Sequence, residues 1–457
     1  MISKQLRTLL QLSKAHGSDL FVVGGPLRDL LLKKKCTDFD FALRGASKLA
    51  KQFARDTRSS LVVLDDTPRR ETSRVVLRKQ VYFDFSEMQG GSIEADLGQR
   101  DFTFNAMALP LEKFLKGTKT FLDPHGGRKD LKNKVVRALP GPVLSSDPLR
   151  MLRAFRFMST FGFEIEPKTL ERIKKQKSKI RAVASERVYS ELILLLSSDQ
   201  AAPSIRTMHN SGLLQCLFPG IHKKGDASGF LRVFDQFEYL ISHPKKTGTV
   251  PLREIENFFS SKRSLVKLAA LLYTLEKLST SSGERRLMKS RHHSKVAKIL
   301  EKLRASNNDI DLVRTATACA CEATDTQLKF AKNPQNSSQL YQFVSHNEDG
   351  LVPGLFLALA ALPELPAKAA WKTNLTLIAV RNTFNFYFKT YLPAKKKKPL
   401  LNGDDLIKQL GLKPGSLFKT ILEQVEEARI LKTIKTRKEA LQFARDVYES
   451  SMGEEIL

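Results

Sequence analysis

The stretch FVVGGPLRDLLLKKKCTDFDF, residues 21–41, decides the fold of the N-terminal part of the chain. Its pattern predicts a short strand, a Gly-Gly turn, a helix from Pro26 to about Lys33 and a second strand that carries Asp38 and Asp40. Because side chains alternate along a strand, the two carboxylates share one face, where they can bind divalent cations. Glycine amides at a helix start can hold phosphate. Either feature alone is often only a turn or a solvated strand face, but together they indicate a site for a nucleoside triphosphate and metal ions.

The same stretch resembles the signature of the class II tRNA nucleotidyltransferases, the CCA-adding enzymes, and of the bacterial poly(A) polymerases related to them. In that family a hydrophobic strand precedes GG-x-x-RD-x-LL, and D-x-D follows. The matching residues are Gly24, Gly25, Arg28, Asp29, Leu31, Leu32, Asp38 and Asp40. The resemblance implies that Asp38 and Asp40 are catalytic and hold two Mg²⁺ ions. It also implies that Gly24, Gly25 and Arg28 bind the nucleotide.

A second stretch, QRDFTFNAMAL at residues 99–109, resembles the family motif RRDFTINAMA. The resemblance implies that Arg100 reaches phosphate or sugar oxygens and that Asp101 and Asn105 hold the ribose hydroxyls. A site that bonds the 2′-hydroxyl rejects deoxynucleotides, because their binding leaves a buried polar group unpaired. Gln99 stands where the family has its first arginine.

A third stretch, SDPLRMLRAFRF at residues 146–157, begins a helix, because Ser and Asp before Pro are typical of helix starts. It resembles the family block E-D-x-x-R, in which Asp and Arg read the incoming base. The residues that recur every three positions are Asp147, Arg150, Arg153 and Arg156. The resemblance implies that Asp147 and Arg150 recognise the edges of C and A, and that Arg153 and Arg156 contact the nucleotide. Ser146 replaces the family's Glu, and we expect it to cap the helix instead.

One further carboxylate, Asp84, has two interpretations. A helix is expected at residues 46–57, and strands at residues 61–64, 73–77 and 81–85. Asp84 in the last strand can act as a third carboxylate beside Asp38 and Asp40, or it can simply cap a strand end.

Strands followed by a long helical pattern predict an α+β protein, and the resemblance implies a nucleotidyltransferase head with a mixed β-sheet followed by all-α segments. We expect the catalytic head at residues 1–140, a neck with the base-reading helix at 141–225, a body at 226–390 and a tRNA-binding tail at 391–457. In the neck, SERVYSEL at residues 185–192 resembles the family's S-x-ER motif. This resemblance implies a bracing role for Glu186 and Arg187.

The formal net charge of +28 indicates a polyanionic partner, nucleic acid rather than membrane. Basic runs at residues 174–181, 285–298 and 395–398 each suit a solvated face, but together they can follow an RNA backbone. The longest apolar run, near residues 351–362, is broken by Pro and Gly and reads as a buried helix. Four cysteines do not make a disulfide framework, which favours a reduced, cytoplasmic protein.

The reaction that the resemblance implies is template-independent addition of C and/or A to the tRNA 3′ end, from CTP and ATP, with pyrophosphate release. The partner would be the tRNA acceptor arm. Full CCA addition, CC-only or A-only addition and poly(A) tailing all fit, as does an inactive RNA-binding relative. Residues 65–74 occupy the place of the loop that helps relatives switch from C to A, and this segment is short here.

Overall fold

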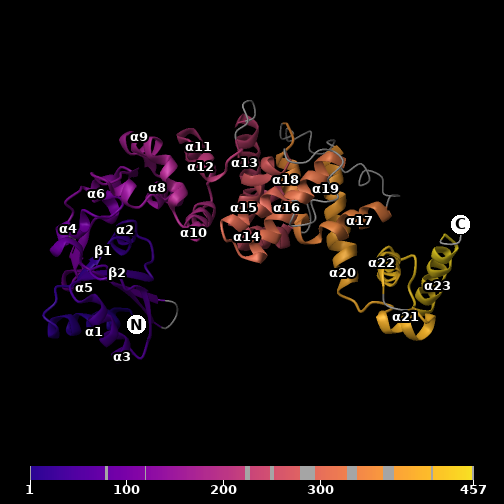
Figure 1. Ribbon diagram of the computed structural model, residues 1–457, viewed down its shortest axis with the longest axis horizontal. Helices are drawn as coiled ribbons and strands as arrows, with labels where there is room; N and C mark the ends of the chain where they lie inside the picture. Colours follow the sequence, from indigo (N-terminus) through magenta and orange to yellow (C-terminus); the bar gives the residue numbers. More distant parts are fainter. Residues whose placement is uncertain are drawn as a thin grey trace. The chain divides into compact units, whose positions relative to one another are not determined.

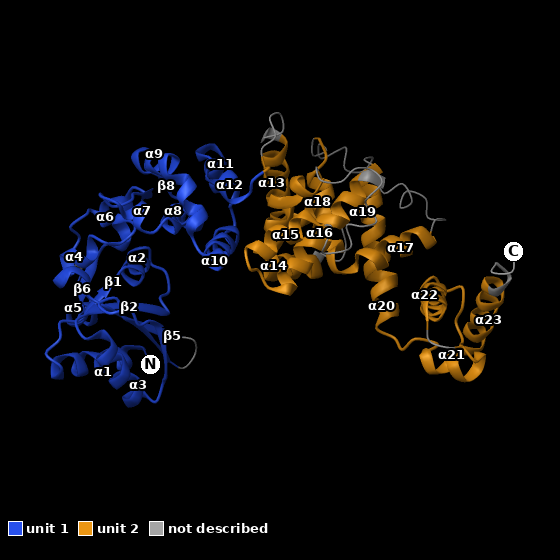
Figure 2. Ribbon diagram, in the orientation of Figure 1, with its two compact units in different colours: residues 1–219 blue, residues 220–457 orange. Residues whose placement is uncertain are grey.

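The computed structural model describes residues 2–77, 81–118, 120–221, 227–247, 252–277, 294–326, 337–363, 375–412 and 415–454. These residues form two compact units, residues 1–219 and 220–457 (Figure 1, Figure 2). The finer division into head, neck, body and tail stays a prediction. Part of the basic run at 285–298, up to residue 293, lies outside the described residues.

The N-terminal unit is built on a six-stranded mixed sheet with the strand order β3-β4-β5-β2-β1-β6. The strands are β1 (Phe21–Val23), β2 (Asp38–Leu43), β3 (Ser60–Asp65), β4 (Thr72–Leu77), β5 (Val81–Glu87) and β6 (Ala108–Pro110). Strands β2 and β5 are parallel, whereas the other neighbours are antiparallel. The strands expected from alternation are therefore confirmed, as is the α+β class.

Alternation along β2 gives the sheet one apolar and one polar face. Phe39 and Phe41 are buried, and helix α3 (Ala46–Thr57) packs Phe53 against Phe83 with ring centroids 5.5 Å apart. Helix α1 (Ile2–Ala15) contacts α3. Because these helices cover the phenylalanine face, the intervening residues of β2, Asp38 and Asp40, lie on the other face.

Helices dominate the rest of this unit. They are α2 (Gly25–Leu31), α4 (Ile93–Leu97), α5 (Leu111–Leu115), α6 (Gly127–Lys132), α7 (Val143–Ser146), α8 (Leu149–Phe161), α9 (Pro167–Gln176), α10 (Ser185–Leu196), α11 (Ala202–Ser211) and α12 (Leu213–Leu217). Single-turn 3₁₀ segments lie at Gln89–Gly91 and Thr103–Asn105, a longer one lies at Lys177–Ala182, and β7 (Val135–Val136) pairs with β8 (Glu164–Ile165). Helix α8 packs on α10 and α11, which fixes the direction of its polar face.

The expected cap of α8 by Ser146 is wrong. Ser146 is the last residue of α7, and its exposed hydroxyl donates to the Val143 carbonyl one turn back. Asp147 instead accepts a hydrogen bond from the Leu149 amide at 3.3 Å. Asp147 and Pro148 separate α7 from α8, so the Ser146 hydroxyl does not bond the first amides of α8.

The second unit is helical throughout its described residues. Its helices are α13 (Ala227–Ser242), α14 (Leu252–Lys277), α15 (Lys295–Lys302), α16 (Asn307–Thr326), α17 (Ser337–Asn347), α18 (Leu351–Ala360), α19 (Leu375–Phe386), α20 (Leu392–Lys395), α21 (Gly403–Leu410), α22 (Ser416–Ile430) and α23 (Arg437–Glu454). Short 3₁₀ segments at Pro244–Thr247 and Glu348–Gly350 and a π-helical turn at Tyr387–Tyr391 complete it.

The apolar run near residue 351 forms the buried helix that the sequence predicted, since every residue of α18 is buried. A Cβ at Gly354 would lie 2.6 Å from Cys319 Cβ on α16, so this close approach needs glycine. Helices α21–α23 enclose a separate apolar cluster that includes Ile421 and Ala440. In the described part of the chain, none of the helices combines the length and apolar character that crossing a membrane requires.

Candidate functional site

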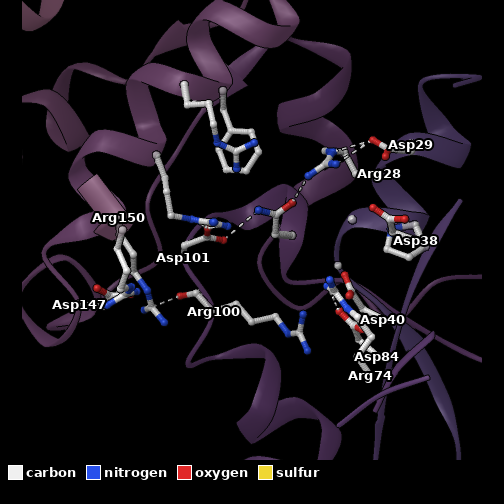
Figure 3. A pocket seen from close by; sticks show the side chains of 18 residues that line it. Arg28, Asp29, Asp38, Asp40, Arg74, Asp84, Arg100, Asp101, Asp147 and Arg150 are labelled. Atoms are coloured by element: carbon white, nitrogen blue, oxygen red, sulfur yellow. Dashed lines mark hydrogen bonds and ion pairs between the residues drawn. The ribbon is translucent and has the colours of Figure 1, made fainter. Parts of the chain in front are cut away.

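A cavity of about 470 Å³ opens on the polar face of the sheet in the N-terminal unit (Figure 3). Its lining comes from β2, β4, β5, α2, α8 and α10, from the residues just before α2 and α8, and from the segment around Arg100. All the candidate residues from the sequence line it: Gly24, Gly25, Arg28, Asp38, Asp40, Asp84, Arg100, Asp101, Asn105, Asp147, Arg150, Arg153 and Arg156. The remaining lining residues are Pro26, Asp29, Arg74, Phe157 and Arg187. The structure thus brings three separate sequence blocks to one place.

One end of the cavity is acidic. Strands β2 and β5 are neighbours, and Asp40 lies directly opposite Asp84 in the ladder. Asp84 is in the middle of β5, so the alternative that it caps a strand end is wrong. Both of its carboxylate oxygens accept hydrogen bonds from the Arg74 guanidinium on β4, each at 2.8 Å. Sequence analysis missed Arg74, although alternation with the buried Ser73 and Val75 puts it on the cavity face.

Asp40 is electrostatically the least satisfied carboxylate of the cavity. Burial is the main cause that raises the pKa of Asp40 to about 6; the like charges of Asp84 and Asp38 act in the same direction, whereas Arg100 and Arg28 act against it. Asp38, two residues earlier on the same face, is exposed. Two carboxylates with these properties suit a divalent cation with oxygen ligands. Within the described ranges, no group of three or more His, Cys, Asp or Glu residues lies close enough together to hold a metal.

The Gly-Gly turn shapes the cavity floor beside Asp40. Gly24 has φ 68° and ψ −123°, and a Cβ there would lie 2.8 Å from Arg100 Nη1. A Cβ on Gly25 would lie 3.4 Å from Asp40 Oδ2. The Gly24 amide donates to the Met107 carbonyl at 3.2 Å. Gly24 is needed here because it has a positive φ and leaves room for the Arg100 side chain, and Gly25 is the first residue of helix α2.

A chain of hydrogen bonds forms the cavity wall from α2 towards α8. Arg28 Nε donates to Asp29 Oδ1, and Arg28 Nη1 donates to Asn105 Oδ1, both at 2.9 Å. The Asn105 amide then donates to Asp101 Oδ1 at 2.9 Å. Arg153 on α8 donates to Asp101 Oδ2 at 2.9 Å and continues the chain. The wall is therefore rigid, and each of these groups is oriented by the next.

Asp101 is the most completely satisfied carboxylate of the cavity. Burial alone would raise its pKa, but Arg153, Asn105 and the Phe102 amide together lower the pKa to about 2. Beyond it, Glu191 on α10 pairs with Arg153 at 3.1 Å and with Arg156 at 2.6 Å. Sequence analysis gave Glu191 no role, and its distance of 35 to 38 residues from these arginines leaves no local signal.

Phe157 on α8 gathers three guanidinium groups over its ring. The Arg156 guanidinium lies 4.1 Å from the ring centroid, and those of Arg28 and Arg153 each lie 5.4 Å away. Burial lowers the pKa of Arg156, while Glu191 acts in the opposite direction. These contacts hold the arginines on one side of the cavity.

The opposite end of the cavity lies at the start of α8 (Figure 3). Arg150 Nη2 donates to the Gln99 carbonyl at 2.9 Å, and its Nη1 donates to the Arg100 carbonyl at 3.3 Å. Arg187 Nη2 donates to Asp147 Oδ2 at 3.0 Å. Arg187 thus lines the cavity, whereas the sequence predicted only a structural role for this residue.

The two departures from the family motifs lie away from the cavity surface. The Gln99 side chain is exposed, and only its backbone carbonyl serves the site, through Arg150. Ser146 is also exposed and does not line the cavity. Neither the Gln99 nor the Ser146 side chain is among the residues that line the cavity.

The cavity separates two kinds of chemistry. Its carboxylate end, with Asp38 and Asp40, can bind cations, and Arg100 lies between that end and the Asp147–Arg150 end (Figure 3). An Asp and an Arg side by side can accept from and donate to a planar heterocycle, and the arginines between can hold phosphate groups. This arrangement suits a nucleoside triphosphate bound lengthwise.

Three family models match the chain. They are the poly A polymerase head domain at residues 20–137, the probable RNA and SrmB-binding site of polymerase A at 162–224, and the putative tRNA nucleotidyltransferase domain 2 at 287–444. The solved structure of the Thermotoga maritima CCA-adding enzyme complexed with tRNA shares the fold, with a TM-score of 0.64 and 24% identity over 97% of this chain and 94% of that one.

Curated relatives match over nearly the whole length. The CC-adding tRNA nucleotidyltransferase of Geobacter sulfurreducens is 30% identical over 97% of this chain and 95% of its own. The A-adding tRNA nucleotidyltransferase of Deinococcus radiodurans is 28% identical over 94% of this chain and 96% of its own. The chain therefore belongs to the family of tRNA nucleotidyltransferases and related poly(A) polymerases that includes the CC-adding, A-adding and CCA-adding enzymes.

Proposed function

We propose that this protein adds C and/or A residues to the 3′ end of tRNA, using CTP and ATP and releasing pyrophosphate. The observation that carries the proposal is the single cavity lined by all three motif blocks. Asp38, Asp40 and Asp84 stand at one end, the Asp147–Arg150 pair stands at the other, and arginines line the space between them. Such a cavity accommodates a ribonucleotide with its triphosphate at the acidic end and its base at α8.

Asp38 and Asp40 are the proposed catalytic carboxylates and the ligands of two Mg²⁺ ions. When bound, such ions make the attacking 3′-hydroxyl a better nucleophile and stabilise the charge of the triphosphate and the leaving group. Asp84 stands next to Asp40, but its two oxygens are held by Arg74. We therefore propose that Asp84, held by Arg74, helps to position the acidic end of the cavity and is not itself a metal ligand.

The triphosphate is proposed to lie along Gly24, Gly25, Arg28 and Arg100. Arg100 pairs with Asp96 through Nε and Nη2, which leaves its Nη1 directed towards the Gly24 turn. A guanidinium fixed on one edge in this way can offer its other edge to phosphate without losing its own orientation.

The ribose and base are proposed to lie along the α8 wall. Asp101, Asn105, Arg153 and Arg156 form the surface against which the sugar packs. Asp147 accepts from the exocyclic amine of C or A, and Arg150 donates to a ring nitrogen or carbonyl. Since U and G reverse this donor and acceptor pattern at the same edge, the pair selects against them.

The RNA substrate is proposed to be the tRNA acceptor arm, held by shape and phosphate contacts through the helical parts of a chain with a net charge of +28. A tRNA substrate also favours a cytoplasmic location. Among the possible specialisations we expect CC addition. The relative from Geobacter sulfurreducens and one from Synechocystis that is 28% identical over 94% of this chain are both CC-adding enzymes. The β3–β4 connection is also short, with only residues 66–71 between the strands.

The test uses purified protein, tRNA that lacks its 3′ end, and CTP, ATP or both. CC addition predicts two labelled C residues with CTP and no further growth with ATP. Three added residues would indicate full CCA addition, one A on a tRNA ending in CC would indicate an A-adding enzyme, and a long tail would indicate poly(A) polymerase. If no product forms although tRNA binds, the protein is an inactive RNA-binding relative and the proposal fails.

A further inference from the structure

Strand β3 is an exposed, apolar edge of the six-stranded sheet. It stands at the end of the strand order, with β4 as its only neighbour in the described part of the chain. Val62, Val63 and Leu64 are 45%, 55% and 49% exposed. These three consecutive side chains alternate between the two faces of the sheet, so the strand is apolar on both faces.

Such an edge normally carries protection against pairing. Natural proteins place Lys, Pro or an inward charge on exposed edge strands, because the free N–H and C=O groups otherwise recruit another strand. Between Ser60 and Leu64 this strand has neither charge nor Pro, and its register shift lies only at its C-terminal end, between Val63 and Asp65. The next strand, β4, alternates regularly and buries Ser73, Val75 and Leu77. The exposed apolar surface is therefore confined to the edge itself.

We propose that a second copy of this chain pairs with β3 in antiparallel fashion, so that the sheets of two N-terminal units join into one. Residues opposite each other in an antiparallel ladder point to the same face. A two-fold axis must therefore pass through a residue position, and the apolar centre of the strand sets it at Val62. Val62 then faces its own copy, and Leu61 of each copy faces Val63 of the other.

The charges at the two ends of the strand favour this partner and this direction. Arg58 precedes β3 and Asp66 follows it, and both are exposed. Arg58 is the C-cap of α3 just before β3, and antiparallel pairing about Val62 brings the Arg58 end of one strand beside the Asp66 end of the other, once at each end. Opposite charges across a ladder stabilise pairing, whereas like charges oppose it. Parallel pairing of two copies would set Arg58 against Arg58 and Asp66 against Asp66.

The paired edge lies apart from the reaction cavity. Asp40 is on β2, three strands further into the sheet than β3. Val63 lies opposite Ser73, on the face that α3 covers, whereas Val62 lies opposite the cavity residue Arg74. Val63 is therefore the position at which pairing can be disturbed with least effect on the cavity.

Sedimentation velocity over a concentration series of the full-length protein tests the proposal. The wild-type protein should dimerise, and Val63→Lys should weaken the dimer at least about tenfold, because it introduces an edge-blocking charge against Leu61 of the second copy. The matched control is Leu194→Lys on α10, where the leucine is 48% exposed and away from the edge. It should dimerise like the wild type, and all three proteins should have the same circular dichroism.

A charge exchange tests the direction of pairing, and it decides the matter even if Val63→Lys folds poorly. Asp66→Arg should weaken the dimer, and Arg58→Asp combined with Asp66→Arg should restore it. A wild-type protein that stays monomeric at every concentration overturns the proposal, even if the edge binds a peptide from another protein. A dimer that is indifferent both to Val63→Lys and to the charge exchange also overturns it.

Discussion

The two ends of the cavity treat their carboxylates in opposite ways. On the α8 wall, Asp101 is buried among Arg153, Asn105 and a backbone amide, and its pKa falls to about 2. On strand β2, Asp40 is also desolvated, and burial raises its pKa to about 6, because the attraction of Arg100 and Arg28 does not offset the cost of burying its charge. The protein thus supplies its own cations at one end and leaves the other end short of positive charge. That shortage marks where an added cation gains most.

The largest effect is expected at the unsatisfied end. Asp40→Ala should lower nucleotide incorporation by about a thousandfold or more, because losing a metal ligand removes several kcal/mol of transition-state stabilisation. Its affinity for tRNA should stay nearly unchanged, since docking depends on the basic surface. The measurement pairs single-turnover incorporation with a filter-binding titration. Asp19→Ala, which removes an exposed carboxylate of the same unit, is the control and should keep both values. Equal loss of activity and tRNA affinity in Asp40→Ala would contradict the assignment.

At the α8 wall, where Asp101 is fully hydrogen-bonded, a substitution should lower the free energy of unfolding. Asp101→Ala leaves Arg153 and Asn105 without their shared acceptor, and we expect a loss of about 3–5 kcal/mol in the free energy of unfolding. Asp38→Ala, at an exposed carboxylate of the acidic end, should change that free energy little. Urea unfolding followed by circular dichroism measures both. If Asp101→Ala unfolds like the wild type, the hydrogen-bonded wall does not support the cavity.

A substitution at the start of α8 should change which base the protein selects. Asp147→Ala removes the acceptor for the exocyclic amine, so we expect the preference for CTP over UTP to fall by about tenfold to a hundredfold. Total incorporation should fall less than it does in Asp40→Ala. Competition between the two nucleotides, measured as a ratio of kcat/KM values, gives the answer. A variant that stays fully selective would refute the reading role.

The smallest expected effect is a change with pH at Asp40. Its folded pKa of about 6 lies above the ordinary carboxyl range, so protonation of Asp40 stabilises the folded, metal-free protein. This contribution to the free energy of unfolding is complete below about pH 4 and is lost as the pH rises through 6. Proton and metal compete for the same oxygens. Mn²⁺, used as a probe, should therefore bind more weakly as pH falls through 6, and titration calorimetry can follow this change. Binding that is constant from pH 7 to pH 5 would count against the raised pKa.

Much of the fold of the N-terminal unit could be predicted, because its signals are local. Alternation alone located β4 and β5 to within two residues, and the periodicity at residues 46–57 gave α3 with its observed bounds. The motif residues were found because they stand close together within short blocks. The cavity then required only that these blocks meet.

The missed features depend on residues that lie far apart in the sequence. Arg74 and Asp84 form an ion pair between neighbouring strands, and Glu191 pairs with Arg153 from another helix. The hydrogen bond from the Gly24 amide to the Met107 carbonyl likewise joins residues far apart in the sequence. Ser146 was expected to cap α8, but α7 ends on it. In the first three cases a neighbour far away in the sequence sets the role, whereas Ser146 bonds a carbonyl three residues back in its own short helix.

The contrast between the two ends is tested most directly by Mn²⁺ binding at pH 7.5, followed by electron paramagnetic resonance. The proteins compared are the wild type, Asp38→Asn and Asp101→Asn. The prediction is that the wild type binds the ion, that Asp38→Asn loses most of this binding and that Asp101→Asn keeps it. The opposite pattern, in which Asp38→Asn still binds Mn²⁺ as the wild type does while Asp101→Asn does not, would contradict the assignment of the cation site to strand β2.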